Sequence, residues 1–164
     1  ARVKQSAMQA FEVPFDVVVT TNSGYPLDQN LYQTIKGISA AAQVVKPGGT
    51  IICASECSDG IPDHGRYGEI LASRSSPKKL LELINTTNYK ALDQWQVQIQ
   101  AKIQTVADVY LQSTYLSNEQ VLKAHITPID DISYTVFQLI DKLGPEATIC
   151  VLPEGPKLVP FVPD

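Results

Sequence analysis

A phenol, an amide and an ammonium group occur close together in the sequence, on Tyr32, Gln33 and Lys36. If this stretch is helical, they lie about 100, 200 and 140 degrees around the axis from Leu31, because each residue turns the helix by about 100 degrees. Lys36 is then one turn from both Tyr32 and Gln33, so the three form one polar patch. An amide and an ammonium group on adjacent turns could bind a carboxylate, provided that another surface excludes water. The alternative interpretation is an ordinary solvated helix face.

The elements that must position this patch can be expected from the flanking residues. Residues 15–21 are apolar and β-branched, which predicts a parallel strand covered on both faces. A turn follows, and a helix is expected from Pro26 or Gln29 to Val45. The apolar stripe of this helix, within about 80 degrees of its circumference, would pack on the sheet and consists of Leu31, Ile35, Ile38, Ala42 and Val45. A strand, a turn and a helix in this order form the place where open α/β sheets bind ligands.

Residues 22–26, between that strand and that helix, could offer backbone N–H groups to an anion at the helix start. Ordinary turn chemistry is the alternative, because Asn, Ser, Gly and Pro are typical turn residues. No G-x-G-x-x-G or Walker pattern occurs in the sequence. A nucleotide-binding module is therefore unsupported, and any cofactor-binding residues are unknown at this point.

Strand and helix patterns continue to alternate along the chain. Lys46-Pro47-Gly48-Gly49 should end the helix and turn the chain. The further elements expected are a strand over 50–55, a loop over 56–68, a helix over 78–83, a helix over 94–104, a strand over 106–112, short helices after Ser117 and over 131–143, a strand over 147–152 and an extended proline-rich tail. This order predicts an α/β fold in one domain over residues 1–164, a three-layer, Rossmann-like sandwich with a mainly parallel sheet.

Trp95, the only tryptophan, falls on the apolar stripe of the helix expected over 94–104. Alternation at Trp95, Val97 and Ile99 also fits a strand, but the wider pattern fits a helix better. A core or interface anchor is the ordinary interpretation of such a tryptophan. A residue that lines a ligand pocket is the alternative.

Other chemically active residues form no complete constellation. Cys53 and Cys57 with His64 do not predict a metal site, because Cys53 should point into the sheet and no second Cys/His pair completes four ligands. His64 lies in a glycine-rich loop at the carboxyl edge of the expected sheet and is a candidate functional residue. Glu56 and Asp59 could serve as acid or base, but neither has an evident partner.

Composition excludes several classes of function. The 164 residues are 44% hydrophobic and carry a formal charge of -4, with no extended basic cluster, so nucleic acid and membrane partners are not expected. Neither a transmembrane stretch nor a secretory signal is evident, which favours a cytoplasmic protein with reduced cysteines. The chain begins at Ala1 and enters a core strand almost directly, which suggests a piece of a longer protein.

Several ordered motifs resemble the C-terminal domain of the nickel-dependent lactate racemase family, most densely over about residues 15 to 68 and more weakly through Trp95. The segments that carry the resemblance are Thr21-Asn22-Ser23-Gly24-Tyr25-Pro26-Leu27-Asp28, Tyr32-Gln33-x-x-Lys36-Gly37, Lys46-Pro47-Gly48-Gly49, Ser55-Glu56-Cys57-x-x-Gly60 and His64-Gly65. Motifs in series are more specific than any one of them.

The resemblance implies a two-domain isomerase that inverts a 2-hydroxy acid such as lactate by hydride abstraction and return. In this family a nickel pincer nucleotide, made from nicotinate, is held by the N-terminal domain, which also supplies the acid/base pair. By position, Gln33 and Lys36 would hold the substrate carboxylate, Tyr32 would shape the same wall, and Trp95 would contact the substrate or cofactor side of the cleft.

On this interpretation the partners of the chain are a small 2-hydroxy acid and the N-terminal domain of the same polypeptide. The chain itself would hold no catalytic residue and no metal ligand, so the isolated fragment is expected to fold but to be inactive. A non-catalytic ligand-binding or regulatory α/β domain is the alternative.

Overall fold

The computed structural model describes residues 7–163 of the protein. Helices and strands alternate along these residues, as expected for an α/β fold. The elements are β1 (Met8–Ala10), β2 (Phe15–Thr21), α2 (Leu31–Ala41), β3 (Val45–Ala54), α3 (Tyr67–Ala72), α4 (Pro77–Ile84), α5 (Gln94–Gln104), β4 (Asp108–Gln112), α6 (Asn118–Lys123), β5 (Thr127–Pro128), α7 (Ile132–Leu143), β6 (Ile149–Leu152), the 3-10 helix η1 (Gly155–Lys157) and β7 (Val159–Phe161).

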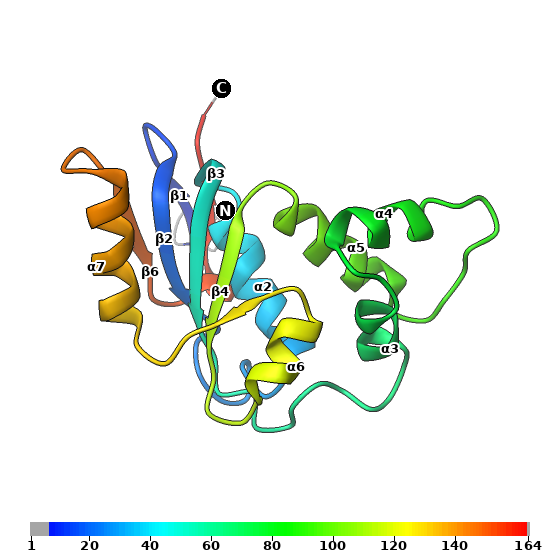
Figure 1. Ribbon diagram of the computed structural model, residues 1–164. Coiled ribbons are helices and arrows are strands. Elements are labelled where there is room, and N and C mark those ends of the chain that lie inside the picture. The colour runs from blue at the N-terminus through cyan, green and yellow to red at the C-terminus, as the bar shows by residue number, and fades with distance from the viewer. Residues whose placement is uncertain (1–6, 164) are drawn as a thin grey trace.

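A five-stranded sheet forms the centre of the fold, with the strand order β5-β4-β3-β2-β6. Every neighbouring pair of its strands is parallel. Figure 1 shows α7 on one side of this sheet and α2 to α5 on the other. The prediction of a three-layer, Rossmann-like α/β sandwich with a mainly parallel sheet is therefore confirmed.

Strand β2 and helix α2 form the part of the core that supports the predicted site. β2 lies between β3 and β6, and its residues Val17 and Val18 are completely buried. The expected apolar stripe of α2 packs inward, with Leu31 and Ile35 fully buried and Ile38 nearly so. The apolar run and the helical periodicity in the sequence both reflect this burial.

Helix α2 is shorter than expected at both ends. It begins at Leu31 because Asn30 is its N-cap, with the Asn30 Oδ1 atom accepting a hydrogen bond from the Gln33 N–H at 3.0 Å. It ends at Ala41, and Val45, expected in the helix, is the first residue of β3. Lys46-Pro47-Gly48-Gly49 therefore lies inside β3 and does not form a turn between elements. The register with β2 shifts at this point, and Gly48 has a φ of +78°, which glycine adopts without strain.

The segments before α3 and after β6 also differ from expectation. Helix α3 begins at Tyr67, inside the segment expected to be loop, because Tyr67, Ile70 and Leu71 supply it with a buried face. The tail is not wholly extended: it forms η1 and then β7, which pairs in parallel with β1. Strands β4 and β6 begin later than expected, and β1 and β5 were not predicted.

Helix η1 lies against the carboxyl end of β2. Crossovers along the sheet reverse direction between β2 and β6, the place where doubly wound sheets usually bind ligands. A Cβ atom added to Gly155 of η1 would lie 2.5 Å from Thr20 Oγ1 and 3.0 Å from Gly37 Cα. The Thr21 hydroxyl donates a hydrogen bond to the Pro153 carbonyl at 2.6 Å. The chain's own backbone thus covers the end of β2 at the reversal.

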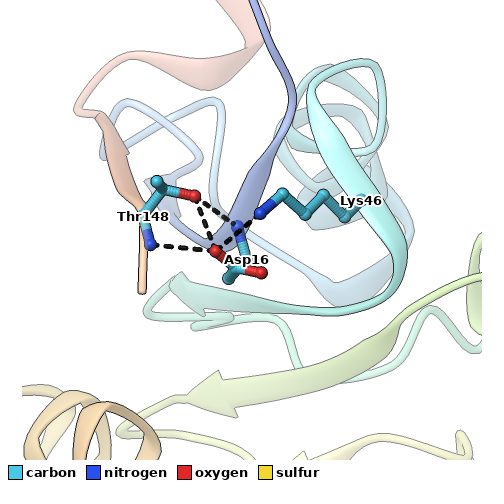
Figure 2. A network of polar contacts seen from close by, with 3 residues as sticks. All are labelled: Asp16, Lys46 and Thr148. Carbon is cyan, nitrogen blue, oxygen red and sulfur yellow. Dashed lines mark hydrogen bonds and ion pairs between the residues drawn. The ribbon is translucent and has the colours of Figure 1, made fainter. Parts of the chain in front are cut away.

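The amino end of β2 is fastened to both neighbouring strands by Asp16 (Figure 2). The Asp16 Oδ2 atom accepts hydrogen bonds from Lys46 Nζ at 2.8 Å, from the Thr148 N–H at 2.9 Å and from the Thr148 hydroxyl at 2.7 Å. Lys46 belongs to β3, and Thr148 immediately precedes β6. The network holds the centre of the sheet at the edge opposite the predicted site.

The three cysteines, Cys53, Cys57 and Cys150, are buried and unbridged, in agreement with the expectation of reduced structural thiols. Burial is the main reason that the pKa of the Cys53 thiol is raised. Within residues 7–163, no helix combines the length and the apolar character needed to cross a bilayer.

Candidate functional site

The first two turns of α2 place the predicted carboxylate-binding residues on the outer surface of the domain. Lys36 is exposed and Gln33 is partly buried, on the side of α2 opposite its buried stripe. Among residues 7–163, neither side chain has an ion-pair or hydrogen-bond partner, a property that Lys36 shares with exposed lysines such as Lys78. The ammonium group and the amide therefore keep their hydrogen-bonding capacity for a ligand.

Tyr32 is not part of a solvated face, because two aromatic rings contact it. Its ring meets those of Tyr67 and Trp95 edge to face, with centroid distances of 5.3 and 5.8 Å. This geometry is favourable for aromatic pairs. Burial and, to a smaller extent, the negative charge of Asp93 raise the pKa of Tyr32, so its hydroxyl stays protonated at neutral pH.

Trp95 lies near the start of α5, which confirms the helical assignment of this segment. The side chain is not part of the core, since 53% of the residue's surface is exposed. Of the ordinary interpretation as a core or interface anchor, the core part is therefore wrong, and the interface part stays a prediction. An exposed indole beside Tyr32 is instead available to a ligand or to a covering surface.

Gln96 and Tyr67 are two supporting residues that sequence reasoning missed. The Gln96 side chain is 3% exposed, and its amide donates a hydrogen bond to the Tyr32 carbonyl at 2.8 Å, which joins α5 to α2. The buried Tyr67 hydroxyl donates to Gln100 Oε1. A signal was present in the sequence, because Gln96 and Gln100 are four residues apart and share a helix face with apolar residues.

A hollow of about 200 Å³ lies beside this cluster, between the starts of α2 and α5 and the loop that precedes α3. The residues that line it are Gln29, Asn30, Tyr32, Gln33, Pro62, His64 and Asp93. Two of the four predicted substrate-binding residues, Tyr32 and Gln33, are thus brought to one hollow. Lys36 and Trp95 do not line it, although Trp95 contacts Tyr32.

A larger hollow of about 450 Å³ lies at the carboxyl ends of β2, β3 and β4 and contains none of the four predicted residues. Glu56 and the buried Asp28 are among its lining residues. Volume alone would make this hollow the first candidate. Asp28 Oδ1, beside the larger hollow, is also without a hydrogen-bond partner among residues 7–163. The smaller hollow is preferred because Tyr32 and Gln33, two of the predicted substrate-binding residues, line it.

The remaining candidates lie apart from this cluster or show no catalytic geometry. No three His, Cys, Asp or Glu side chains within residues 7–163 are close enough together to hold a metal ion. Cys57 is fully buried. The His64 side chain is 84% exposed, and its Nδ1 atom lies 3.9 Å from Asp63 Oδ1. His125, the other histidine of the sequence, contacts the Leu71 carbonyl oxygen through Nε2 at 3.1 Å, a structural role.

Comparison of sequences connects the chain with one group of proteins. Residues 10–159 match the family described as the lactate racemase C-terminal domain. A lactate racemase from Thermoanaerobacterium thermosaccharolyticum is 33% identical over 147 residues, which cover 89% of this chain and 34% of that protein. A lactate racemase from Lactiplantibacillus plantarum is 35% identical over 142 residues, which cover 85% of this chain and 33% of that protein. The chain therefore spans about a third of the length of these curated relatives.

Comparison of structures agrees with this result. The lactate racemase apoprotein from Thermoanaerobacterium thermosaccharolyticum superimposes with a TM-score of 0.87 at 30% identity, covering 99% of this chain and 39% of that chain. A protein from Thermotoga maritima shares the fold, with a TM-score of 0.60 at 12% identity, and covers 98% of this chain and 40% of that chain.

Proposed function

The chain belongs to the family of lactate racemase C-terminal domains, and we propose that it is the substrate-binding domain of a longer, two-domain racemase or epimerase of 2-hydroxy acids. One observation carries the proposal: Gln33 and Lys36 present an amide and an ammonium group on one rigid helix, without partners among residues 7–163. A 2-hydroxy acid has a carboxylate of matching size and charge.

Each residue of the cluster has a distinct role in this proposal. Lys36 supplies the positive charge for the substrate carboxylate, and Gln33 donates a hydrogen bond that fixes its orientation. Tyr32 forms the wall beside them and is itself held by Tyr67 and Gln96. Trp95, which contacts Tyr32, would help to exclude water once the N-terminal domain covers the site. Together these side chains would hold the Cα–H of the substrate in one direction, which is the requirement for stereochemical inversion.

The resemblance also implies a nickel pincer nucleotide. Since the resemblance places this group in the N-terminal domain, we assign it to the part of the protein outside this chain. When bound, it would accept hydride from the substrate Cα and return it. The residues described here bind and orient the acid, and Trp95 with Tyr32 limits the access of water to it.

The test is a racemisation assay of the full-length protein, loaded with nickel pincer cofactor, on a panel of D- and L-2-hydroxy acids. We expect Lys36→Ala to lower kcat/KM by about 100-fold or more, because it removes the charge that binds the carboxylate. Lys78→Ala, an exposed lysine at the start of α4, is the matched control and should leave the rate unchanged.

The outcomes separate the site from the activity. If Lys36→Ala does not change the rate of racemisation, the proposal of a racemase stands and the proposed carboxylate-binding site is rejected. If no 2-hydroxy acid is racemised, the non-catalytic ligand-binding domain becomes the better interpretation.

A further inference from the structure

We propose that the hollow beside Tyr32 and Gln33 receives the substituent on Cα of the hydroxy acid, and that this substituent carries a neutral hydroxyl group. The inference rests on the proposed function, since it assumes that Gln33 and Lys36 hold the carboxylate. It adds a substrate class, the 2,3-dihydroxy and longer polyhydroxy acids, and a residue that selects it, Asp93.

The position of the hollow supports the first part. Tyr32 and Gln33 line it and also belong to the carboxylate-binding cluster, so the two are continuous. An acid held through its carboxylate at Gln33 therefore has the groups on its Cα next to the hollow. A methyl group would leave most of about 200 Å³ unfilled, whereas a hydroxylated side chain would occupy it.

The chemistry of the lining supports the second part. Besides Tyr32 and Gln33, four of the lining residues carry hydrogen-bonding side chains: Gln29, Asn30, His64 and Asp93. The Asn30 Oδ1 atom already accepts the Gln33 N–H, so its side-chain NH2 group is the part that stays available. A methyl group placed here would displace water from polar groups without replacing its hydrogen bonds. A hydroxyl group can donate and accept at once, so it can satisfy such a lining.

Asp93 argues against a second carboxylate on the substrate. Its charge acts inside the cluster, since it contributes to the raised pKa of Tyr32. No lysine or arginine is among the residues that line the hollow. A dicarboxylic acid would therefore bring its second negative charge close to Asp93 without a lysine or arginine in the lining to compensate it. A neutral hydroxyl would instead donate a charge-assisted hydrogen bond to it.

The backbone holds Asp93 in place. Its φ is +66°, and its Oδ2 atom accepts a hydrogen bond from the Arg66 N–H at 3.3 Å. The carboxylate packs directly on Gly65, where an added Cβ atom would lie only 1.8 Å from Oδ2. Any other residue at position 65 would displace the Asp93 side chain, so the geometry of this wall depends on that glycine.

The experiment compares kcat/KM of the full-length, cofactor-loaded protein for lactate, glycerate and malate, which differ in the substituent on Cα. We expect glycerate to be preferred over lactate by at least about 10-fold, with malate disfavoured. Asp93→Asn removes the charge but keeps the shape, and asparagine tolerates a positive φ, so the fold should persist. This variant should reduce the preference for glycerate several-fold and raise kcat/KM for malate by about 10-fold.

Asp141→Asn, on the exposed side of α7 across the sheet, makes the same change of charge away from the hollow and is the control. A preference for lactate over glycerate in the wild type, or an Asp93→Asn variant with unchanged selectivity, would overturn the inference while leaving the racemase proposal standing. If no acid is racemised, the proposed function fails. Calorimetric titration with glycerate and lactate then still decides this inference, which is rejected if glycerate binds no more tightly.

Discussion

At the scale of single residues, Asp16 shows how the fold stabilises one charge. Hydrogen bonds from Lys46 and from both donors of Thr148 lower the pKa of its carboxyl group well below the usual range. A carboxyl group whose pKa is lower in the folded state stabilises that state above its unfolded pKa of about 3.9. This stabilisation by Asp16 is lost as the pH falls toward the pKa that the carboxyl group has in the folded state.

Asp16→Asn should therefore destabilise the domain in a pH-dependent way. At pH 7 we expect the free energy of unfolding to fall by about 1–3 kcal/mol, because asparagine cannot form the ion pair with Lys46. The difference from wild type should shrink as the pH is lowered below about 4. Urea unfolding followed by circular dichroism at several pH values measures it. Asp141→Asn is the control, with an expected change within about 0.5 kcal/mol, and a difference for Asp16→Asn that does not vary with pH would contradict the explanation.

At the scale of elements, helix α2 is fixed by close backbone contacts at Gly37, one helical turn after Gln33. The Asn22 side chain is 1% exposed, and its Oδ1 atom accepts a hydrogen bond from the Gly37 N–H at 2.9 Å. Gly37 and Gly155 face each other where η1 meets α2. This contact holds the helix that carries Gln33 and Lys36.

Gly37→Ala tests this contact. A Cβ atom at position 37 would lie 2.8 Å from the Thr21 carbonyl oxygen and 2.9 Å from Asn22 Oδ1. In an ordinary helix the change would stabilise by about 1 kcal/mol, but here overpacking against backbone should exceed that gain. We expect a net loss of about 1–2 kcal/mol in the free energy of unfolding.

Urea unfolding compares this variant with Lys36→Ala, which places alanine at the exposed neighbouring position of the same helix. That variant should change stability by less than about 0.5 kcal/mol. A Gly37→Ala protein more stable than wild type would show that η1 and β2 move apart easily and do not hold α2.

At the scale of the whole molecule, the chain covers about a third of its lactate racemase relatives, and its proposed substrate residues lie on an open surface. Lys36 is exposed, and Trp95 is 53% exposed. A carboxylate bound by an ammonium group in open water gains little, because the high dielectric constant weakens the attraction. The proposed site therefore needs a second domain to cover it.

The isolated 164-residue chain should accordingly not racemise any 2-hydroxy acid, while the cofactor-loaded full-length protein does. Polarimetric or chiral chromatographic assays measure this, with circular dichroism to establish that the isolated chain is folded. Racemisation by the folded, isolated chain would place the reactive groups within these residues and reject the division of roles proposed here.

Local patterns in the sequence determined much of the fold and the polar face of α2. The continuous apolar run of β2 predicts a buried parallel strand. The spacing of Leu31, Ile35 and Ile38 predicts a helix with one buried face. Gln33 and Lys36 could be placed on the outer face of α2 for the same reason. Their role as substrate ligands comes from the resemblance and remains a prediction.

Only the tertiary structure decided what surrounds that face. Trp95 contacts Tyr32, and Asp93 lines the hollow. Both positions depend on the course of the chain between α2 and α5, which no periodicity in the sequence predicts. The same holds for the placement of η1 against Gly37 and of Lys46 to Gly49 inside β3. Such contacts join residues distant in sequence, and they depend on turns, bulges and the exact shape of neighbouring side chains. Local sequence patterns determine single helices and strands, because each has its own periodicity. The site depends on how several of these elements pack together.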